Sequence, residues 1–285
     1  MISPSQHNTF SFDLIAYLQH AIMVTLRVKY PHPRDKHIKF KEYGHKYFIK
    51  GSKTPSTSVT TVIHRLFPEF DPDAVIEKIQ SSRNFDESSP YWGMEPQEIK
   101  DMWKQNGRES SQLGTLLHNT IEDYYNGKNI AVDATIAPEW EQFVTFDSKF
   151  RKKNPTFEPY RAEWMIYDES INLAGTIDMV YRDTETGVLH IVDWKRSKEI
   201  KTENRFESGN HPATEHLPAT NFWQYSLQQN IYKYILEKHY GVTVGSLHLV
   251  IMHPNQTTYK KMKVPLMTDT IDDIVYSIEH HGLCE

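Results

Sequence analysis

The spacing of apolar residues changes several times along the chain, and strand-like alternation predicts the centre of the fold. Residues 37–53 alternate apolar and polar side chains around Gly44, a pattern typical of a β-hairpin. Residues 160–195 contain three apolar stretches separated by turn residues at 168–170 and 184–187. This second region predicts a meander of three antiparallel strands.

Helical spacing predicts the elements on either side of these strands. Serine and threonine residues precede two helical stretches within residues 55–80, and Asp71-Pro72 opens the second of them. Polar residues, glycines and prolines fill residues 81–96 and 198–221, which we predict to be loops. The remaining predicted elements are an N-terminal helical segment before residue 37, helices at 97–106, 110–126, 137–152, 222–241 and 269–280, and strands at 245–252 and 258–265.

The order of these elements predicts the fold class. Helices, a meander, a helix and two further strands are typical of an α/β fold with a mixed, largely antiparallel central sheet flanked by helices. The boundary near residue 95 is weakly marked. We predict an N-terminal elaboration of hairpin and helices over residues 1–95 and a single core domain over residues 96–285.

Composition excludes several classes of site. The chain has 285 residues, enough for a substantial core, and its single cysteine is Cys284. A disulfide framework and a metal site made of cysteines alone, including an iron–sulfur cluster, are therefore excluded. The net charge is −5, so nucleic acid would have to bind at a local basic patch. The candidate patches are residues 151–153 and the set Lys195, Arg196, Lys198 and Lys201.

The apolar stretches are too short for a membrane protein. None approaches the roughly 18 residues that cross a bilayer. The most apolar segment, residues 14–26, contains polar residues and precedes no small-residue cleavage site. We therefore expect an intracellular protein of the cytoplasm or nucleus. The first 36 residues contain only two acids, Asp13 and Asp35, which leaves a mitochondrial transit peptide, and hence the matrix, as an alternative.

Charged residues interrupt two apolar strands of the predicted meander. Asp193 and Lys195 follow the apolar run 189–192, and side chains two apart on a strand point to the same face. If residues 184–187 form the hairpin loop, Asp178 of the preceding strand falls opposite Asp193, with Cβ atoms about 5 Å apart. A shift of one residue in the register would undo this pairing.

Adjacent carboxylates of this kind predict a metal site. Two carboxylates in a half-buried sheet repel each other unless a cation or a proton lies between them. Oxygen-rich sites suit Mg²⁺ or Mn²⁺ better than a soft metal. A bound metal would polarise a phosphate and lower the pKa of a water, and Lys195 would orient or activate that water. The alternative is a solvated cluster of ion pairs at strand ends.

Two further groups of polar residues each have two interpretations. Glu163 should share a face with Asp178, so that it either adds a carboxylate to the site or pairs with Arg161. Gln228 and Tyr232 share one face of the helix at 222–241. They form either the polar border of an amphipathic helix or part of the site.

Four short motifs occur in an order typical of one nuclease family. They are "GTLLH" at 114–118, "GTID" at 175–178, "IVDWK" at 191–195 and "QQNIY" at 228–232. With this order and spacing the chain resembles the PD-(D/E)XK nuclease superfamily. More narrowly, it resembles the RecB-like branch, which includes the mitochondrial genome maintenance exonuclease. The resemblance covers residues 114–252 well and implies a restriction-endonuclease-like core.

The resemblance also implies roles for individual residues. Gln228 and Tyr232 would support the catalytic face and the DNA. Several relatives carry four cysteines for an iron–sulfur cluster, and their absence here implies the cluster-free form. The implied active-site set comprises Asp178 and Asp193 as the metal-binding acids, Lys195 as the lysine, His118 as a metal ligand and the main-chain carbonyl of Trp194 as a further ligand.

These observations together predict a nuclease that depends on a divalent metal, with DNA as its partner. An exonuclease acting on single strands or duplex ends is the favoured interpretation. The alternatives are an endonuclease or an RNA-cleaving member of the same fold, and a non-catalytic nucleic-acid-binding relative. A sugar- or protein-binding α/β module with accidental motifs would place Asp178 and Asp193 far apart.

Overall fold

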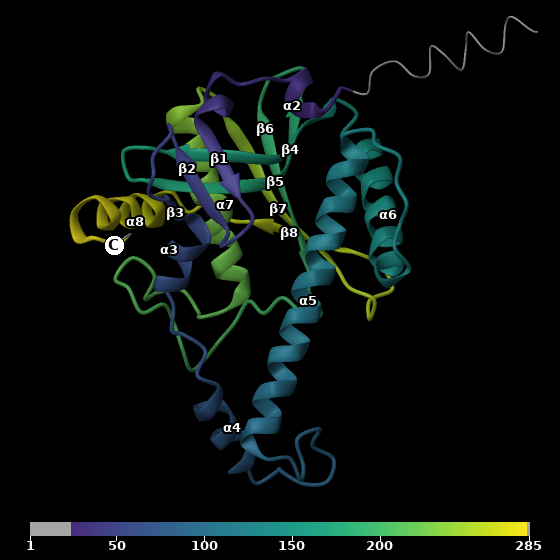
Figure 1. Cartoon of the computed structure of the whole chain (residues 1–285), viewed down its shortest axis with the longest axis vertical. Coiled ribbons are helices and arrows are strands. Elements are labelled where there is room, and N and C mark those ends of the chain that lie inside the picture. The colour runs from purple at the N-terminus through teal and green to yellow at the C-terminus, as the bar shows by residue number, and fades with distance from the viewer. Residues whose placement is uncertain (1–23, 284–285) are drawn as a thin grey trace, which may run out of the picture.

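The computed structural model of the chain describes residues 24–283 (Figure 1). Most of the predicted N-terminal helical segment, and Cys284, lie outside these residues. The described part begins with α2, Leu26–Lys29, and the short 3-10 helix η1, Pro33–His37. Across residues 24–283, no helix is long and apolar enough to span a bilayer.

A six-stranded mixed sheet forms the centre of the molecule, as the sequence predicts. Its strands are β3 (Thr57–Ser58), β4 (Phe157–Asp168), β5 (Leu173–Asp183), β6 (Leu189–Arg196), β7 (Val244–Met252) and β8 (Lys260–Val264). The order is β3-β5-β6-β7-β8, and β4 pairs with β5 outside this path. The pairs β4–β5, β5–β6 and β7–β8 are antiparallel, whereas β3–β5 and β6–β7 are parallel. The predicted three-stranded meander is confirmed.

Strand β5 carries two different partners along one of its edges. Strand β4 pairs along the length of β5, so β3 and β6 share the opposite edge. Strand β3 pairs with residues 173–174 of β5 and β6 pairs with residues 179–182. Residues 175–178 lie between these two ladders. The sheet therefore opens at the segment that ends with Asp178.

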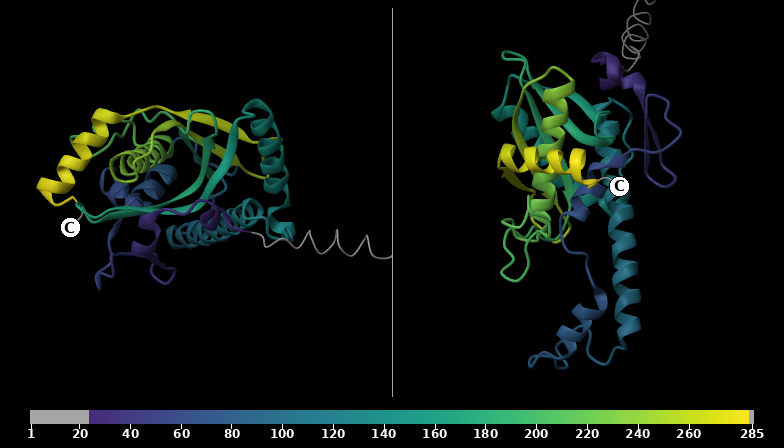
Figure 2. Two further views of the ribbon diagram at one scale, coloured as in Figure 1. Left: turned by 90° about the horizontal axis from the view of Figure 1, so that it is seen from above. Right: turned by 90° about the vertical axis from the view of Figure 1, so that its left-hand side faces the viewer.

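Helices cover both faces of the sheet (Figure 2). One face packs against α3 (Val59–Arg65), α7 (Asn221–His239) and α8 (Thr268–His281) in the larger apolar core. The other face packs against α6 (Ala137–Lys153) and the C-terminal part of α5 (Pro96–Tyr125) in a second core. The sequence predicts α6, α7 and α8 at these positions.

Helix α5 corrects a prediction, because the sequence predicts two helices at 97–106 and 110–126. The structure has one continuous helix of 30 residues, which passes through Gly107. A single glycine in a helix interior costs only about 1 kcal/mol. The strong helix formers around it, with a bond from Gln105 to Glu109 across one turn, offset that cost. The N-terminal half of α5 and α4 (Pro72–Gln80) project away from the sheet as an arm (Figure 1).

The predicted hairpin is confirmed as β1 (Ile38–Lys41) and β2 (Lys46–Ile49), with Gly44 at a φ of 79° in its turn. The inner face of the hairpin packs against β4 and β5 in a small third core. The hydroxyl of Tyr47 on this face lies 2.9 Å from the hydroxyl of Thr176 on β5. The hairpin and α5 cover the same face of the sheet (Figure 2).

The predicted boundary between residues 95 and 96 coincides with the start of α5. Segments from before this point nevertheless take part in the central sheet, because β3 pairs with β5 and α3 packs in the larger core. The division of the chain into an N-terminal elaboration and a core domain stays a prediction. The predicted loops at 81–96 and 198–221 contain no helix or strand before α5 and α7 begin.

Candidate active site

The loop of the β5–β6 hairpin sets the register of the two central acids. Val180 pairs with Ile191 and Met179 with Val192, as expected for a loop at residues 184–187. The next pair in this register is Asp178 and Asp193. There the ladder ends, and a carboxylate oxygen of Asp178 accepts a hydrogen bond of 2.8 Å from the backbone N–H of Trp194. Where β5 and β6 separate, the side chain of Asp178 therefore takes the place of a backbone carbonyl as the acceptor for β6.

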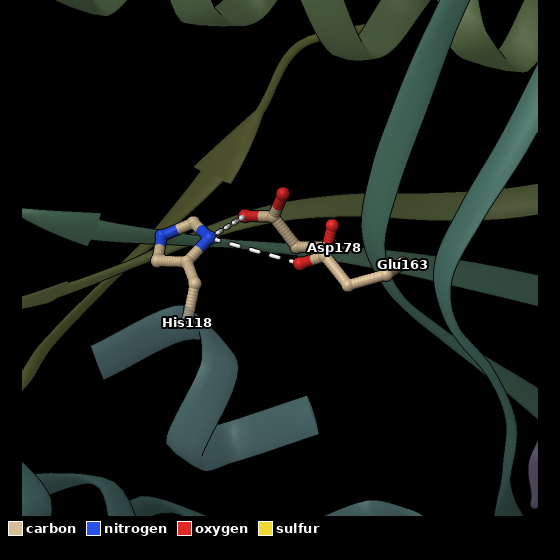
Figure 3. Close-up of side chains that lie close together, drawn as sticks. All are labelled: His118, Glu163 and Asp178. Atoms are coloured by element: carbon tan, nitrogen blue, oxygen red, sulfur yellow. Dashed lines mark ion pairs between the residues drawn. The ribbon is translucent and has the colours of Figure 1, made fainter. Parts of the chain in front are cut away.

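Three side chains from three elements meet beside this opening (Figure 3). They are His118 of α5, Glu163 of β4 and Asp178 of β5, and one potential ligand atom from each lies within 4.8 Å of the others. Nδ1 of His118 is 3.7 Å from Asp178 Oδ2 and 3.8 Å from Glu163 Oε1. These distances exceed those of hydrogen bonds, so the three groups face one another across a gap.

Glu163 reaches this position through an unusual backbone conformation. It lies opposite Asp178, between the pairs Ala162–Met179 and Trp164–Ile177. Its φ of 45° is in the left-handed region, which is rare for a residue with a side chain. Of the two predicted alternatives, the structure places Glu163 beside His118. The other candidate partner, Arg161, forms its ion pair with Asp35, at 2.9 Å.

His118 bridges the two carboxylates and the backbone of β6. Its Nε2 lies 3.0 Å from the carbonyl oxygen of Trp194, and because a carbonyl only accepts, Nε2 carries a hydrogen. Nδ1 then faces the carboxylates. Burial lowers the pKa of His118, but the negative charges of Asp178 and Glu163 outweigh it and raise the pKa to about 9.

The second acid, Asp193, is buried and paired with the lysine. Its Oδ2 lies 2.7 Å from Nζ of Lys195, and the Lys195 ammonium lies 4.5 Å from the centre of the Tyr225 ring. Burial and the neighbouring Asp178 raise the pKa of Asp193 to about 6, although Lys195 opposes the shift. Burial lowers the pKa of Lys195, but the charges of Asp193 and Asp178 outweigh burial and raise the pKa above its usual value. The lysine is therefore a cation at neutral pH.

Helix α7 supports the opening in the sheet from the opposite face. Nε2 of Gln228 donates to the Tyr232 hydroxyl at 3.1 Å and to the Thr60 hydroxyl at 3.2 Å. The ring of Tyr232 lies against Gly175, where an added Cβ would come within 2.6 Å of a ring carbon. Only glycine permits this close approach. The "GTID" and "QQNIY" motifs therefore contact each other next to Asp178.

The donor set fits a hard divalent cation. Two carboxylates and an imidazole nitrogen face a common point, and Asp193 lies next to them in the strand register. Carboxylate oxygens suit Mg²⁺ and Mn²⁺, and two adjacent half-buried acids favour a bound cation. The predicted ligand role of the Trp194 carbonyl stays a prediction, since this oxygen contacts His118 in the structure.

Two features of the site are missing from the sequence interpretation. Tyr225 lies beneath the Lys195 ammonium, and Tyr47 of the hairpin bonds to Thr176 close to Asp178. A signal for Tyr225 exists, because it lies one turn before Gln228 and two turns before Tyr232 on the same helix. Tyr47 has no local signal, since its partner lies 129 residues away in the chain.

A search of curated proteins found no match. Among solved structures, a Eubacterium rectale protein described as a putative exonuclease is 14% identical, with a TM-score of 0.41 over 80% of this chain and 78% of that one. The protein SSO0001 is 15% identical, with a TM-score of 0.30 over 78% of this chain and 73% of that one.

A family model gives the decisive comparison. The model of the PD-(D/E)XK nuclease superfamily matches residues 97–281. The matched segment covers more than half of the chain and contains all the site residues that the sequence predicts, from His118 to Tyr232. The central mixed sheet with flanking helices is consistent with the fold of this superfamily. The chain belongs to the PD-(D/E)XK nuclease superfamily.

Proposed function

We propose that this protein is a divalent-metal-dependent nuclease of the RecB-like branch that hydrolyses phosphodiester bonds in DNA. The observation that carries the proposal is the convergence of His118, Glu163 and Asp178 within 4.8 Å, next to the pair formed by Asp193 and Lys195. Acids, imidazole and ammonium together supply ligands for a metal and a positive charge for a phosphate.

The acids and His118 would hold the metal. Asp178, Glu163 and Nδ1 of His118 face the common point, and Asp193 would join them when its contact with Lys195 loosens. A bound divalent cation would polarise the scissile phosphate and make a water more acidic. The hydrogen on Nε2 of His118, directed at the Trp194 carbonyl, fixes the orientation of the ring.

Lys195 would act as a positive charge rather than as a base. Its pKa is raised by the charges of Asp193 and Asp178, so it keeps its protons at neutral pH. An ammonium can donate hydrogen bonds to the attacking water and to a phosphate oxygen, where negative charge develops. Asp193 and the ring of Tyr225 position this ammonium from two sides.

Gln228 and Tyr232 would support the site without taking part in bond breaking. Tyr232 is buried, and its hydroxyl is held by Gln228. Burial and the charges of Tyr47, Asp193 and Asp178 raise the pKa of Tyr232 well above its usual range, so the hydroxyl stays neutral. A neutral hydroxyl beside Gly175 would maintain the spacing between α7 and β5.

The arm of the molecule supports a preference for free DNA ends. Lys78 at the end of α4 lies 4.9 Å from the ring of Phe206, which belongs to the loop at 198–221. This contact connects the projecting arm with the loop that follows β6, the strand of Asp193 and Lys195. A single strand that has to pass such a connection would enter by its end, which would make the enzyme an exonuclease.

Digestion of linear and circular DNA tests the proposal. We expect end-labelled linear single strands to be degraded with Mg²⁺ or Mn²⁺ and to persist with EDTA, while covalently closed single-stranded circles of the same sequence persist in all conditions. Asp193→Asn should remove cleavage and keep part of the DNA binding. The exposed turn variant Glu185→Gln should cleave like the parent.

Three outcomes would contradict parts of the proposal. Circles nicked as fast as linear strands are shortened would replace the exonuclease with an endonuclease. Cleavage of RNA in preference to DNA would change the substrate. Hydrolysis by Asp193→Asn at the parent rate in Mn²⁺ would remove the assigned site.

A further inference from the structure

The hairpin β1–β2 and its flanks concentrate positive charge in an acidic protein. Residues 36–53 contain six lysines and one acid, Glu42. This segment has a net charge of +5 in a chain of net charge −5, so the remaining residues carry −10. The candidate basic patches predicted from the sequence lie elsewhere, at 151–153 and around Lys195.

Strand pairing places three of these lysines on one face. Lys39 pairs with Phe48 and Lys41 pairs with Lys46, whereas the apolar pairs alternate with them and face the sheet. Residues opposite each other in a ladder share a face. Lys39, Lys41 and Lys46 are exposed, and Nζ of Lys41 lies 4.9 Å from the centre of the half-buried Phe48 ring. The outer face of the hairpin is therefore basic around one aromatic ring.

Among the residues that the structure describes, most of these lysines have no acidic partner. Lys50 pairs with Glu169 at 2.8 Å. Within residues 24–283, the other five make no ion pair. An open depression of about 830 Å³ borders the outer face, lined mainly by Lys36, Lys39, Lys41, Phe48 and Lys53. Unpaired cations around a shallow depression suit an extended polyanion better than a small ligand.

The inner face connects the hairpin to the candidate active site. Tyr47 bonds to Thr176, which precedes Asp178 by two residues on β5. A cavity of about 260 Å³ lies between the hairpin and α5, with Ile38 on one side and Glu163 among its lining residues. The basic outer face therefore belongs to an element that borders the metal-binding residues, on the face of the sheet that also carries α5 (Figure 1).

We propose that the outer face of the β1–β2 hairpin, centred on Lys39, Lys41 and Lys46, binds the phosphate backbone of the DNA that lies outside the active site. The inference rests on the proposed nuclease function and deepens it by naming a docking surface for the substrate. The contacts are sequence-independent, because lysines on a strand face reach phosphates and not base edges.

Binding measured without cleavage tests this surface. The parent is the full chain with Asp193→Asn, titrated with a fluorescent single strand of about 30 nucleotides between roughly 50 and 200 mM salt. The hairpin variant adds Lys39→Ala, Lys41→Ala and Lys46→Ala. We expect the slope of log affinity against log salt to fall by about 2, since each lost phosphate contact removes roughly 0.7 on a single strand. The affinity at the lowest salt should fall at least tenfold.

A matched variant and a stability measurement make the result specific. The control replaces the exposed Lys260, Lys261 and Lys263 of β8 with alanine and should bind DNA like the parent. Both triple variants should keep the parent melting temperature, because all the replaced side chains are exposed. A second hairpin variant, Lys36→Ala with Lys53→Ala, should reduce the slope by about 1.

The outcomes separate this inference from the proposed function. A hairpin variant with the parent affinity and salt slope, or an equal loss in the β8 control, would overturn the docking surface. Binding of heparin with no binding of DNA would overturn it as well. The proposed function fails by a different measurement, the absence of cleavage by the unmodified chain in Mg²⁺ or Mn²⁺, which leaves the binding comparison unaffected.

Discussion

Two clusters of charge lie two residues apart on strand β4, and they are built in opposite ways. Arg161 donates to both carboxylate oxygens of Asp35, at 2.9 and 3.2 Å, and the indole of Trp164 donates to the same carboxylate at 3.0 Å. Glu163 faces His118 at 3.8 Å and forms no bond of this quality. The first cluster is closed by its own donors, and the second is open.

The difference distinguishes a structural cluster from the candidate functional one. Asp35 also accepts from the backbone N–H of His32, so its lone pairs are occupied by protein donors. Burial raises the pKa of Asp35, but the bonds and charge of Arg161 outweigh burial and lower it. In the open cluster, burial and the neighbouring Glu163 raise the pKa of Asp178, although the charges of His118 and Lys195 oppose the shift. An acid whose ionised form is unfavourable in the free protein is prepared to receive a cation.

The strongest test of the contrast removes an acid from the open cluster. Asp178→Asn should reduce DNA cleavage by about a thousandfold, because the charge that would hold the metal in the proposed site is lost. The amide oxygen can still accept from the backbone N–H of Trp194, so the fold should persist. Cleavage rates in Mn²⁺ and urea unfolding check both parts. Loss of folding together with activity would mean that this cluster is structural too.

Breaking the closed cluster should have the opposite effect. Arg161→Met leaves the Asp35 carboxylate buried without its cation, and we expect the free energy of unfolding to fall by about 3 kcal/mol. Cleavage per folded molecule should stay unchanged. The control is Arg182→Met, which breaks the more exposed pair with Glu158 and should cost less than about 1 kcal/mol. Equal destabilisation by both variants would remove the distinction between buried and exposed pairs.

The two clusters should also respond to different pH ranges. The pKa of His118 is raised to about 9, so in EDTA its contribution to stability is complete below about 6.5 and is lost as the pH rises through 9. Its side chain is 26% exposed, and we expect a loss of about 2 kcal/mol between pH 6.5 and 9. The contribution of Asp35, whose pKa is lowered, is lost only as the pH falls into the acid range.

Unfolding in urea at several pH values measures this difference. His118→Gln should remove the alkaline loss of stability and leave the acid loss in place. Added Mg²⁺ should stabilise the parent more at pH 9 than at pH 6.5, since metal and proton compete for His118. An alkaline loss that persists in His118→Gln would assign the titration to another group.

The smallest expected effect concerns Glu163. Glu163→Gln keeps the shape of the side chain and removes its charge, so the Mg²⁺ concentration for half-maximal cleavage should rise about tenfold. The maximal rate should change less, because Asp178 and Asp193 remain. Glu158→Gln, on the same strand, serves as the control. An unchanged Mg²⁺ requirement would make Glu163 a neighbour of the site without a part in metal binding.

The sequence predicts the parts of this site that depend on local spacing. The length of the loop at 184–187 determines the register of β5 and β6, and the register places Asp178 opposite Asp193. The spacing of apolar residues and the residues that cap helices predict α6, α7 and the hairpin. Local spacing does not predict the single helix α5. A lone glycine within a polar stretch indicates a break between two helices, whereas the structure has one continuous helix there.

The closed cluster had no signal in the sequence. Asp35 and Arg161 are 126 residues apart, and each is an ordinary charged residue in its own segment. For the same reason the sequence does not decide whether Glu163 belongs to the site or pairs with Arg161, since the partner of Arg161 lies far away in the chain. The φ of Glu163 was equally invisible, because nothing in its neighbours requires a left-handed residue. Long-range pairing decides such cases, whereas periodicity describes only the local chain.

The backbone of Glu163 sets two selective pressures against each other. A left-handed conformation costs a residue with a side chain about 1–2 kcal/mol relative to glycine, which adopts it freely. Selection for stability alone would therefore favour Glu163→Gly, and selection for metal binding would oppose it. Descendants that no longer need to cut nucleic acid should accumulate glycine or asparagine at this position while the fold around it survives. The identity of residue 163 would then record whether a lineage has kept its chemistry.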